Sequence, residues 1–365
     1  MTTNSKGLLI QLKYKSNENC LNSVLKRMIK PTSRMIRSIL LIIAFSAGSV
    51  VAQNPSAAEY NIEGIFEIGT VQSLMLEKEG EILFEEYRGG MDRNRTTNIK
   101  SASKSILSLL IGIAIERGDI KGVDQKISHY FPDYFESNSD SIKETITIKD
   151  LLTMRSGLET TSFSNYGRWV LSGNWIEFAL DQPLEHDPGG RMIYSTGSSH
   201  LLSVILTRAS GKSTREYAMD HLFGPMNIQI GGWDRDPQGY YMGGNNVALS
   251  PHALLKLGRL LGDMGKYEGQ QLVPETWIRD SIDIYTRSNF NDYNFGYMWW
   301  RKSAGEMDVL FAWGNGGQYI MILPELNAVV IITSDVERGT GSRAYQRRVF
   351  SFLEQTIIPY LTDAG

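Results

Sequence analysis

Ser101 and Lys104 stand three residues apart at the head of a long apolar segment, Ser101-Ala-Ser-Lys-Ser-Ile-Leu-Ser-Leu-Leu-Ile. Residues at this spacing share one face of a helix, so we expect the serine hydroxyl and the lysine amine to meet. A lysine at the root of a buried helix loses solvation, which lowers its pKa until the neutral amine can accept a serine proton. The pair therefore indicates an activated serine nucleophile. The alternative is a helix-capping serine beside a surface lysine.

Tyr194 is a candidate for a second proton-transfer group. It follows a Pro188-Gly-Gly loop and directly precedes a predicted helix, in Met192-Ile-Tyr-Ser-Thr-Gly-Ser-Ser-His. A phenol at that position can stand beside Ser101 and exchange a proton with it. The alternative is a core tyrosine followed by helix-capping hydroxyls.

Three glycines interrupt a strand pattern in Phe311-Ala-Trp-Gly-Asn-Gly-Gly-Gln-Tyr-Ile. Glycine weakens the interior of a strand and often marks the close approach of a ligand or of another backbone. A backbone amide there, such as that of Gln318, can pair with the amide of Ser101 to bind an oxyanion. A β-bulge or a hairpin turn is the alternative.

The elements that must position these residues follow from hydrophobic periodicity. Strands at 71–77 and 81–87 form a hairpin, and a helix from Ser101 stops at Gly118. The remaining elements are helices within 147–222 and 250–281, strands at 296–301, 309–313, 318–323 and 328–333, and a final helix at 343–361. Strands at both chain ends predict an α+β (mixed α/β) fold: one antiparallel sheet with helices on its faces and an inserted helical subdomain.

We expect three regions along the chain. Residues 1–52 are an export signal region, 53–62 a polar linker, and 63–365 one serine hydrolase domain. Within that domain, a sheet lobe covers about 63–122 and 245–365, and a helical lobe covers about 123–244. A substrate cleft is expected where the two lobes meet.

The N-terminal region has the order of a secretory signal peptide. Positive charges precede an apolar run within Met35–Ala52, and small residues end it at Val50-Val51-Ala52. The run is shorter than the ~20 residues that span a bilayer, so we expect export to a periplasm or beyond, with an uncleaved membrane anchor as the alternative. Cys20, the only cysteine, lies upstream of the cleavage site, so the mature protein would have neither disulfides nor a cysteine nucleophile.

The net charge of the chain and the spacing of its histidines limit which partners and cofactors are expected. The 365 residues have a net charge of −3, but residues 1–52 are basic, which leaves −10 on the remainder. Such a body is a poor electrostatic match for nucleic acid. The five histidines show no His-Glu-x-x-His or comparable spacing, so we expect no metal and no other cofactor. Nothing in the sequence indicates an oligomeric state.

The ordered set of Ser101-x-x-Lys104, Tyr194 and the glycine-rich strand resembles the serine β-lactamase and penicillin-recognising superfamily, over about residues 65–360. The most similar branch contains class C β-lactamases, D-alanyl-D-alanine carboxypeptidases and esterases. Three further stretches support the resemblance: Thr147-Ile-Lys-Asp-Leu-Leu-Thr-Met-Arg-Ser-Gly-Leu, Asp187-Pro-Gly-Gly-Arg-Met-Ile-Tyr-Ser-Thr and Leu249-Ser-Pro-His-Ala-Leu-Leu-Lys-Leu-Gly. The resemblance implies a β-lactamase/transpeptidase-like fold.

The resemblance also implies roles for the candidate residues. Ser101 would be the acylated nucleophile, Lys104 and Tyr194 the general bases and acids, and the amides of Ser101 and Gln318 the oxyanion hole. The candidate substrate-binding residues are Asn315, Gly316, Gly317, Thr196 and, as an aromatic wall, Trp169. Ser172-Gly-Asn174 imitates a Ser-x-Asn motif of the superfamily, but its place before Trp175 favours a helix cap.

Two departures from the β-lactamase pattern narrow the expected substrate. Tyr194-Ser195-Thr196 replaces Tyr-x-Asn, and Asn315-Gly316-Gly317 replaces Lys-Thr-Gly. Because that lysine helps to bind the carboxylate of penicillins and peptides, the sequence predicts weak β-lactam hydrolysis. The variant set is closer to the branch with 6-aminohexanoate-dimer hydrolases and lactamase-fold esterases.

We therefore expect an exported serine hydrolase that cleaves a small-molecule ester or amide through an acyl-serine intermediate. The enzymatic alternative is a peptidoglycan D,D-peptidase or weak β-lactamase. The non-enzymatic alternative is a ligand-binding protein of the same fold that has lost turnover. The absence of a Gly-x-Ser-x-Gly elbow argues against an α/β-hydrolase.

Overall fold

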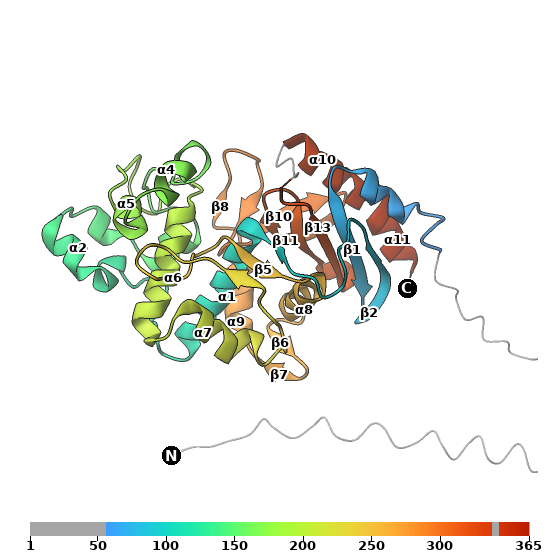
Figure 1. Cartoon of the computed structure of the whole chain (residues 1–365), viewed down its shortest axis with the longest axis horizontal. Coiled ribbons are helices and arrows are strands. Elements are labelled where there is room, and N and C mark those ends of the chain that lie inside the picture. Colours follow the sequence, from blue (N-terminus) through green and yellow to red (C-terminus); the bar gives the residue numbers. More distant parts are fainter. Residues whose placement is uncertain (1–55, 338–342, 365) are drawn as a thin grey trace, which may run out of the picture. The chain divides into compact units, whose positions relative to one another are not determined.

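An eight-stranded antiparallel sheet organises the protein in a computed structural model that describes residues 56–337 and 343–364 (Figure 1). The strand order is β2-β1-β13-β12-β11-β10-β9-β8, so the first two strands pair with the last one. The strands are β1 (Val71–Lys78), β2 (Glu81–Tyr87), β8 (Thr286–Arg287), β9 (Asn294–Phe295), β10 (Trp300–Ala304), β11 (Met307–Gly314), β12 (Gln318–Leu323) and β13 (Ala328–Ser334). The prediction of one antiparallel sheet built from both chain ends is confirmed.

Helices cover both faces of the central strands. The ring of Tyr319 on β12 lies 6.2 Å from that of Phe350 on α10 (Arg343–Phe352). The next residue, Ile320, faces α8 (Pro251–Gly262), where a Cβ added to Gly258 would lie 3.2 Å from it. Successive residues therefore face opposite helices, which explains why β12 and β13 are buried throughout instead of alternating between buried and exposed positions.

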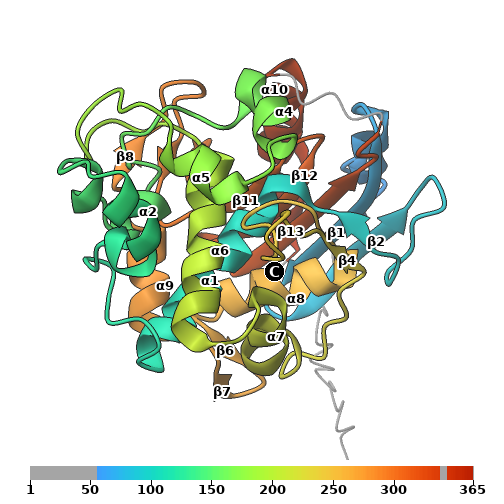
Figure 2. The same ribbon diagram turned by 60° about the vertical axis from the view of Figure 1, so that its left-hand side comes forward.

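The central helix is α1 (Ser103–Glu116), and it is buried from Ser103 to Ala114. It contacts α6 (Thr196–Ser210), α9 (Glu275–Ile282) and β11, and Figure 2 shows α1 and α6 side by side. After Arg117 the chain leaves the helix through Gly118 at φ 79°. The predicted buried helix and its glycine stop are both confirmed.

Short helices surround α6 at one end of the sheet. They are α2 (Pro132–Ser137), α3 (Ile148–Leu152), α4 (Tyr166–Val170), α5 (Trp175–Leu180) and α7 (Thr214–Ala218), of which α3, α5 and α7 contact α6 directly (Figures 1 and 2). Capping boxes at Thr147 and Ser213 set the starts of α3 and α7. Two small sheets complete the fold: β3 (Thr97–Asn98), β5 (Val247–Leu249) and β4 (Gly232–Trp233), and the pair β6 (Lys266–Tyr267) and β7 (Gln270–Gln271).

Two predicted elements are wrong in their bounds. The strand expected at 296–301 begins only at Trp300, because Met298 has the left-handed φ of 64°, which breaks extended backbone. The helix expected at 343–361 is interrupted by a π-turn at Leu353–Ile357 before α11 (Ile358–Asp363). Pro359 follows the π-turn and has no N–H to donate into a regular helix.

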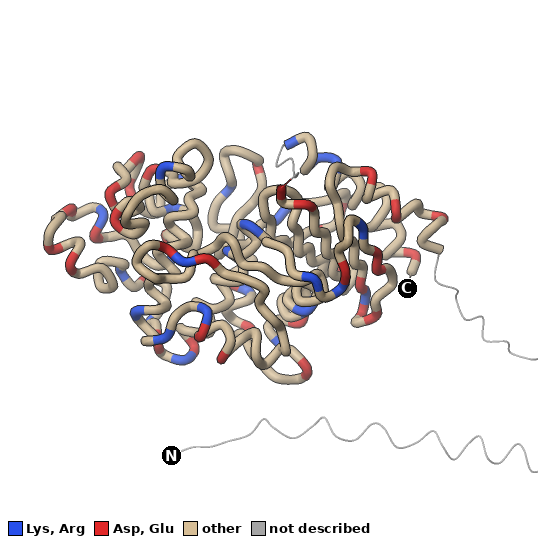
Figure 3. Tube along the Cα trace, in the orientation of Figure 1, with Lys and Arg blue, Asp and Glu red and all other residues tan. Residues whose placement is uncertain are grey.

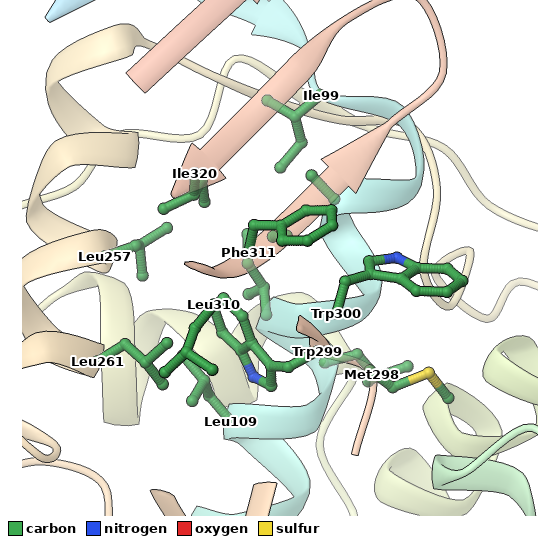
Figure 4. Packing of buried hydrophobic residues seen from close by; sticks show 14 of the residues in the cluster. Ile99, Leu109, Leu257, Leu261, Met298, Trp299, Trp300, Leu310, Phe311 and Ile320 are labelled. Atoms are coloured by element: carbon green, nitrogen blue, oxygen red, sulfur yellow. The ribbon is translucent and has the colours of Figure 1, made fainter. Parts of the chain in front are cut away.

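The main core joins the sheet to α1 and α8. Figure 4 shows side chains from α1, α8 and the inner strands lying together, among them Leu109, Leu257, Leu261, Leu310 and Ile320. Acidic and basic positions are interspersed over the outer helices and turns (Figure 3). Among the described residues, no helix has the length and apolarity to cross a membrane. The predicted signal region lies outside the described residues and stays a prediction.

The contact of α1 with α9 makes Gly112 a test of core packing. Glycine to alanine inside a helix normally stabilises it by about 1 kcal/mol. A Cβ at Gly112, however, would lie 2.3 Å from Cγ of the buried Trp277 ring. We therefore expect Gly112→Ala to lower the free energy of unfolding by about 1–3 kcal/mol in urea denaturation. Gly262→Ala is the matched control, because its Cβ meets nothing closer than 3.8 Å. Equal stability of the two variants would contradict the prediction.

Candidate active site

Ser101 lies in a tight 3-10 turn, Lys100–Ala102, that leads directly into α1. The preceding residue, Lys100, has the left-handed φ of 50°, which costs a non-glycine residue about 1–2 kcal/mol. Two hydrogen bonds hold this conformation: Lys100 N–H donates to Asn98 Oδ1 at 2.8 Å, and Ser103 Oγ donates to Lys100 O at 2.6 Å. The strained turn leaves Ser101 half-buried at the mouth of the helix, as its sequence position predicts.

Lys104 is buried behind Ser101, with 2% of its surface exposed. Its Nζ lies 3.2 Å from Ser101 Oγ, 3.3 Å from Thr196 Oγ1 and 2.7 Å from the carbonyl oxygen of Gly244. Burial lowers the pKa of Lys104 to about 7, so a large share of the amine is neutral at neutral pH. The Gly244 carbonyl can only accept, which commits one amine N–H to it and leaves a lone pair available to Ser101.

Tyr194 joins the same cluster from the turn before α6. Lys104 Nζ lies 5.1 Å from the centre of the Tyr194 ring. Burial raises the pKa of Tyr194 to about 12, and a hydrogen bond with Ser101 opposes the rise. The phenol is therefore protonated at neutral pH and suited to donate a proton. The structure thus brings the three predicted residues Ser101, Lys104 and Tyr194 together.

Thr196, predicted to contact the substrate, lies instead beside the Lys104 amine. It is the first residue of α6 and only 3% exposed, and its Oγ1 meets Lys104 Nζ and, at 2.9 Å, Ser162 Oγ. The side chain therefore presents little surface to a ligand. Thr196 belongs to the surroundings of the amine.

The glycine-rich strand lies against the nucleophile turn. The Lys100–Ala102 turn contacts β11 and β12. A Cβ at Gly314 would lie 2.1 Å from the backbone oxygen of Ile99, so only glycine allows this approach. Gly316 and Gly317 follow with φ of 87° and 99°, and Asn315 is exposed at the turn. The close approach predicted for this strand is therefore one of backbone to backbone.

Gln318 begins β12 and is fully buried. Its side-chain amide donates to Ser334 O at 2.8 Å, and its oxygen accepts from Ser334 N–H at 3.3 Å. These bonds fix the strand start beside the Ser101 turn. The use of the Gln318 backbone amide in an oxyanion hole stays a prediction.

Trp169 does not form a wall of the site, contrary to the sequence-based expectation. It is fully buried in a separate cluster with Trp175 and Met242, and its Nε1 donates to Trp175 O at 3.0 Å. A side chain without exposed surface cannot contact a ligand. Asn174, by contrast, accepts from Ile176 N–H and Glu177 N–H as the predicted cap of α5.

Sequence reasoning missed the aromatic side chains around Tyr194. Its ring stacks on Trp300 at 6.0 Å and lies 6.1 Å from Phe163 and 5.9 Å from Phe290. Phe163 is 63% exposed and has the strained φ of 53°. Its neighbour Ser162 anchors it, because Thr196 N–H donates to Ser162 Oγ at 2.8 Å. An apolar surface therefore borders the phenol.

Sequence reasoning also missed Gly244. Its φ is 77°, and a Cβ there would lie 2.4 Å from Lys104 Cγ. The signal was the Gly243-Gly244 pair before β5, because paired glycines outside a helix mark a close approach. The glycine pair alone does not indicate that Lys104 is the residue that packs against it.

Comparisons with known proteins agree with this arrangement. A family model described as Beta-lactamase matches residues 57–350. The 6-aminohexanoate-dimer hydrolase of Paenarthrobacter ureafaciens is 22% identical over 277 residues, which cover 69% of each chain.

Solved structures share the fold. EstCE1, described as a hydrolase with promiscuous acyltransferase activity, superposes with a TM-score of 0.66 at 17% identity, covering 82% of this chain and 97% of that one. A penicillin-binding protein from Bacillus halodurans gives a TM-score of 0.62 at 15% identity, covering 81% of this chain and all of that one. The predicted β-lactamase/transpeptidase-like fold is confirmed.

The burial of Lys104 predicts a pH dependence for the reactivity of Ser101. Only the neutral amine accepts a proton, so the rate of Ser101 modification by a fluorophosphonate should rise with pH through about 7 and then level off. The rate is measured by quenching the labelling reaction after a series of times at each of several pH values. Lys104→Arg is the control, because a guanidinium stays protonated and should leave only slow modification without this rise. A wild-type rate that is flat through neutral pH would exclude Lys104 as the base.

Proposed function

Because the chain belongs to the beta-lactamase family, whose members are serine hydrolases, we propose that it is an exported hydrolase that cleaves neutral esters or amides through an acyl-serine intermediate. The observation that carries the proposal is the 3.2 Å contact between Ser101 Oγ and a buried amine whose pKa is about 7. Burying a lysine amine is costly, so its place beside a half-buried hydroxyl favours a chemical role over a structural one.

Acylation begins with the Ser101 proton. Neutral Lys104 accepts it as Ser101 Oγ attacks the substrate carbonyl carbon, which forms a C–O bond and an oxyanion. The backbone amides of Ser101 and Gln318 stabilise that oxyanion, a contribution of about 3 kcal/mol for one donor in comparable enzymes. Tyr194, protonated at neutral pH, donates a proton to the leaving alcohol or amine as its bond to carbon breaks.

Deacylation repeats these steps with water. Tyr194, left as a phenolate by the acylation step, takes a proton from a water molecule, whose oxygen attacks the acyl carbon. The bond to Ser101 Oγ then breaks, Lys104 returns a proton to the serine, and the acid product leaves.

Neutral, apolar-sided substrates fit the surroundings of Ser101. Asn315 offers hydrogen bonds but no charge, and Phe163 and Phe290 border Tyr194. The Paenarthrobacter ureafaciens relative is named a 6-aminohexanoate-dimer hydrolase, and EstCE1 is described as a hydrolase with promiscuous acyltransferase activity. Both descriptions support hydrolysis through transfer of an acyl group.

The nucleophile assignment is tested with Ser101→Ala. We expect this variant to lose fluorophosphonate labelling and hydrolysis of p-nitrophenyl butyrate while it keeps its unfolding temperature. Ser172→Ala is the matched control, because Ser172 Oγ donates to the Trp169 carbonyl within the helical part. Labelling that persists in Ser101→Ala and disappears in Ser172→Ala would identify Ser172 as the nucleophile in place of Ser101. A wild type that binds ester without turnover would support the non-catalytic alternative.

Substrate choice is tested at Asn315. A lysine there would add a charge-assisted hydrogen bond worth about 1.5–3 kcal/mol to a β-lactam carboxylate. The wild type should therefore hydrolyse p-nitrophenyl butyrate clearly and nitrocefin weakly, and Asn315→Lys should recover about ten- to a hundredfold in nitrocefin acylation. Asn315→Gln keeps the side chain neutral and serves as the control. More efficient wild-type hydrolysis of nitrocefin than of the ester would favour the β-lactamase alternative.

A further inference from the structure

A buried, hydrogen-bonded histidine–aspartate pair lies behind the proposed catalytic residues. His200 is four residues after Thr196 on α6, and its Nε2 is 2.8 Å from Asp236 Oδ2, with both side chains fully buried. Trp169 and Trp175 flank the imidazole at 5.7 and 5.6 Å between ring centres. A carboxylate and an imidazole are expensive to bury among aromatic rings unless each hydrogen bond is made.

The hydrogen bonds determine which nitrogen of His200 carries the proton. Gly243 N–H donates to Nδ1 at 3.2 Å, so Nδ1 must present a lone pair. The carboxylate of Asp236 accepts, so Nε2 carries the hydrogen. Tyr240 N–H donates to the other carboxylate oxygen, Asp236 Oδ1, at 2.7 Å, which fixes the carboxylate in turn. Asp236 therefore selects the tautomer that can accept from Gly243.

The segment that His200 holds is pressed between α6 and Lys104. A Cβ at Gly243 would lie 2.2 Å from Ser199 O, and a Cβ at Gly244 would lie 2.4 Å from Lys104 Cγ. Ser199 Oγ donates to Gly243 O at 2.9 Å, and Gly244 O accepts from Lys104 Nζ at 2.7 Å. A shift of Gly243 is therefore transmitted directly to the carbonyl that orients the amine.

We infer that His200, held in one tautomer by Asp236, is a positioning residue that fixes the Gly244 carbonyl against Lys104. The inference rests on the proposed function, because it concerns the orientation of the proposed base. His200 acts through Gly243 and Gly244, which direct one amine N–H away from Ser101 and turn the lone pair toward it.

Two substitutions of His200 separate this role from simple core filling. The oxygen of an asparagine lies near the position of Nδ1, so His200→Asn can still accept from Gly243 N–H. The amide of a glutamine reaches the position of Nε2, so His200→Gln can still donate to Asp236 but loses the acceptor for Gly243. If His200 only donated a hydrogen bond to Asp236, the glutamine variant would be the better one.

The measured quantity is the rate of Ser101 modification by a fluorophosphonate in the full chain, compared at equal folded fraction. We expect a loss of about a hundredfold in His200→Gln, as for other small displacements of a reacting group, and of less than about tenfold in His200→Asn. Ser203→Ala is the matched control, because Ser203, on the same helix, donates to Tyr241 O of the same segment at 2.7 Å but not to the glycines, and should keep the wild-type rate. Equal losses in the two His200 variants, or the reverse order, would overturn the inference. A wild type whose Ser101 does not react would instead refute the proposed function.

A second measurement needs no substitution that endangers folding. In wild-type protein labelled with ¹⁵N-histidine, the imidazole N–H that exchanges most slowly with solvent should belong to His200. We expect its spectrum at neutral pH to show hydrogen on Nε2 and an unprotonated Nδ1. Hydrogen on Nδ1, in either the other tautomer or an imidazolium, would overturn the inference even if no His200 variant folds.

Discussion

The exclusion of water from one amine is the constraint on which the rest of the site depends. Lys104 is 2% exposed, and its amine forms hydrogen bonds with a serine hydroxyl, a threonine hydroxyl and a backbone carbonyl. A carboxylate in any of these places would hold the ammonium and raise the pKa of Lys104. Uncharged oxygen atoms satisfy its hydrogen bonds and still allow the proton to leave near pH 7.

Dense backbone packing creates that environment. Gly314 admits the Ile99 carbonyl, Gly244 admits Lys104, and Gly112 admits the Trp277 ring. At each of these positions, the lack of a glycine side chain lets two elements approach closely enough to exclude solvent. Hydrogen bonds with Asn98 and Ser103 hold Lys100 in a left-handed conformation, and they offset the strain of the turn that carries Ser101.

Local patterns predicted much of this arrangement from the sequence. Ser101 and Lys104 are one helical turn apart, and the strands of the sheet are apolar runs between turns, so short windows contain both signals. The contacts of Lys104 with Thr196 and Gly244 join residues far apart in the chain, and no local period encodes them. The expectation for Trp169 failed for a related reason: an indole is equally suited to a core and to a ligand wall, and only its neighbours decide.

The pairing of β1 with β13 joins the two ends of the domain, so the surroundings of Ser101 depend on strands that come last in the chain. The turn that carries Ser101 rests on β11 and β12, and β13 closes the sheet between β12 and β1. Residues far downstream of Ser101 therefore complete its surroundings: without β11 and β12 the turn that carries it has no strands to rest on, and without β13 those strands are not joined to β1.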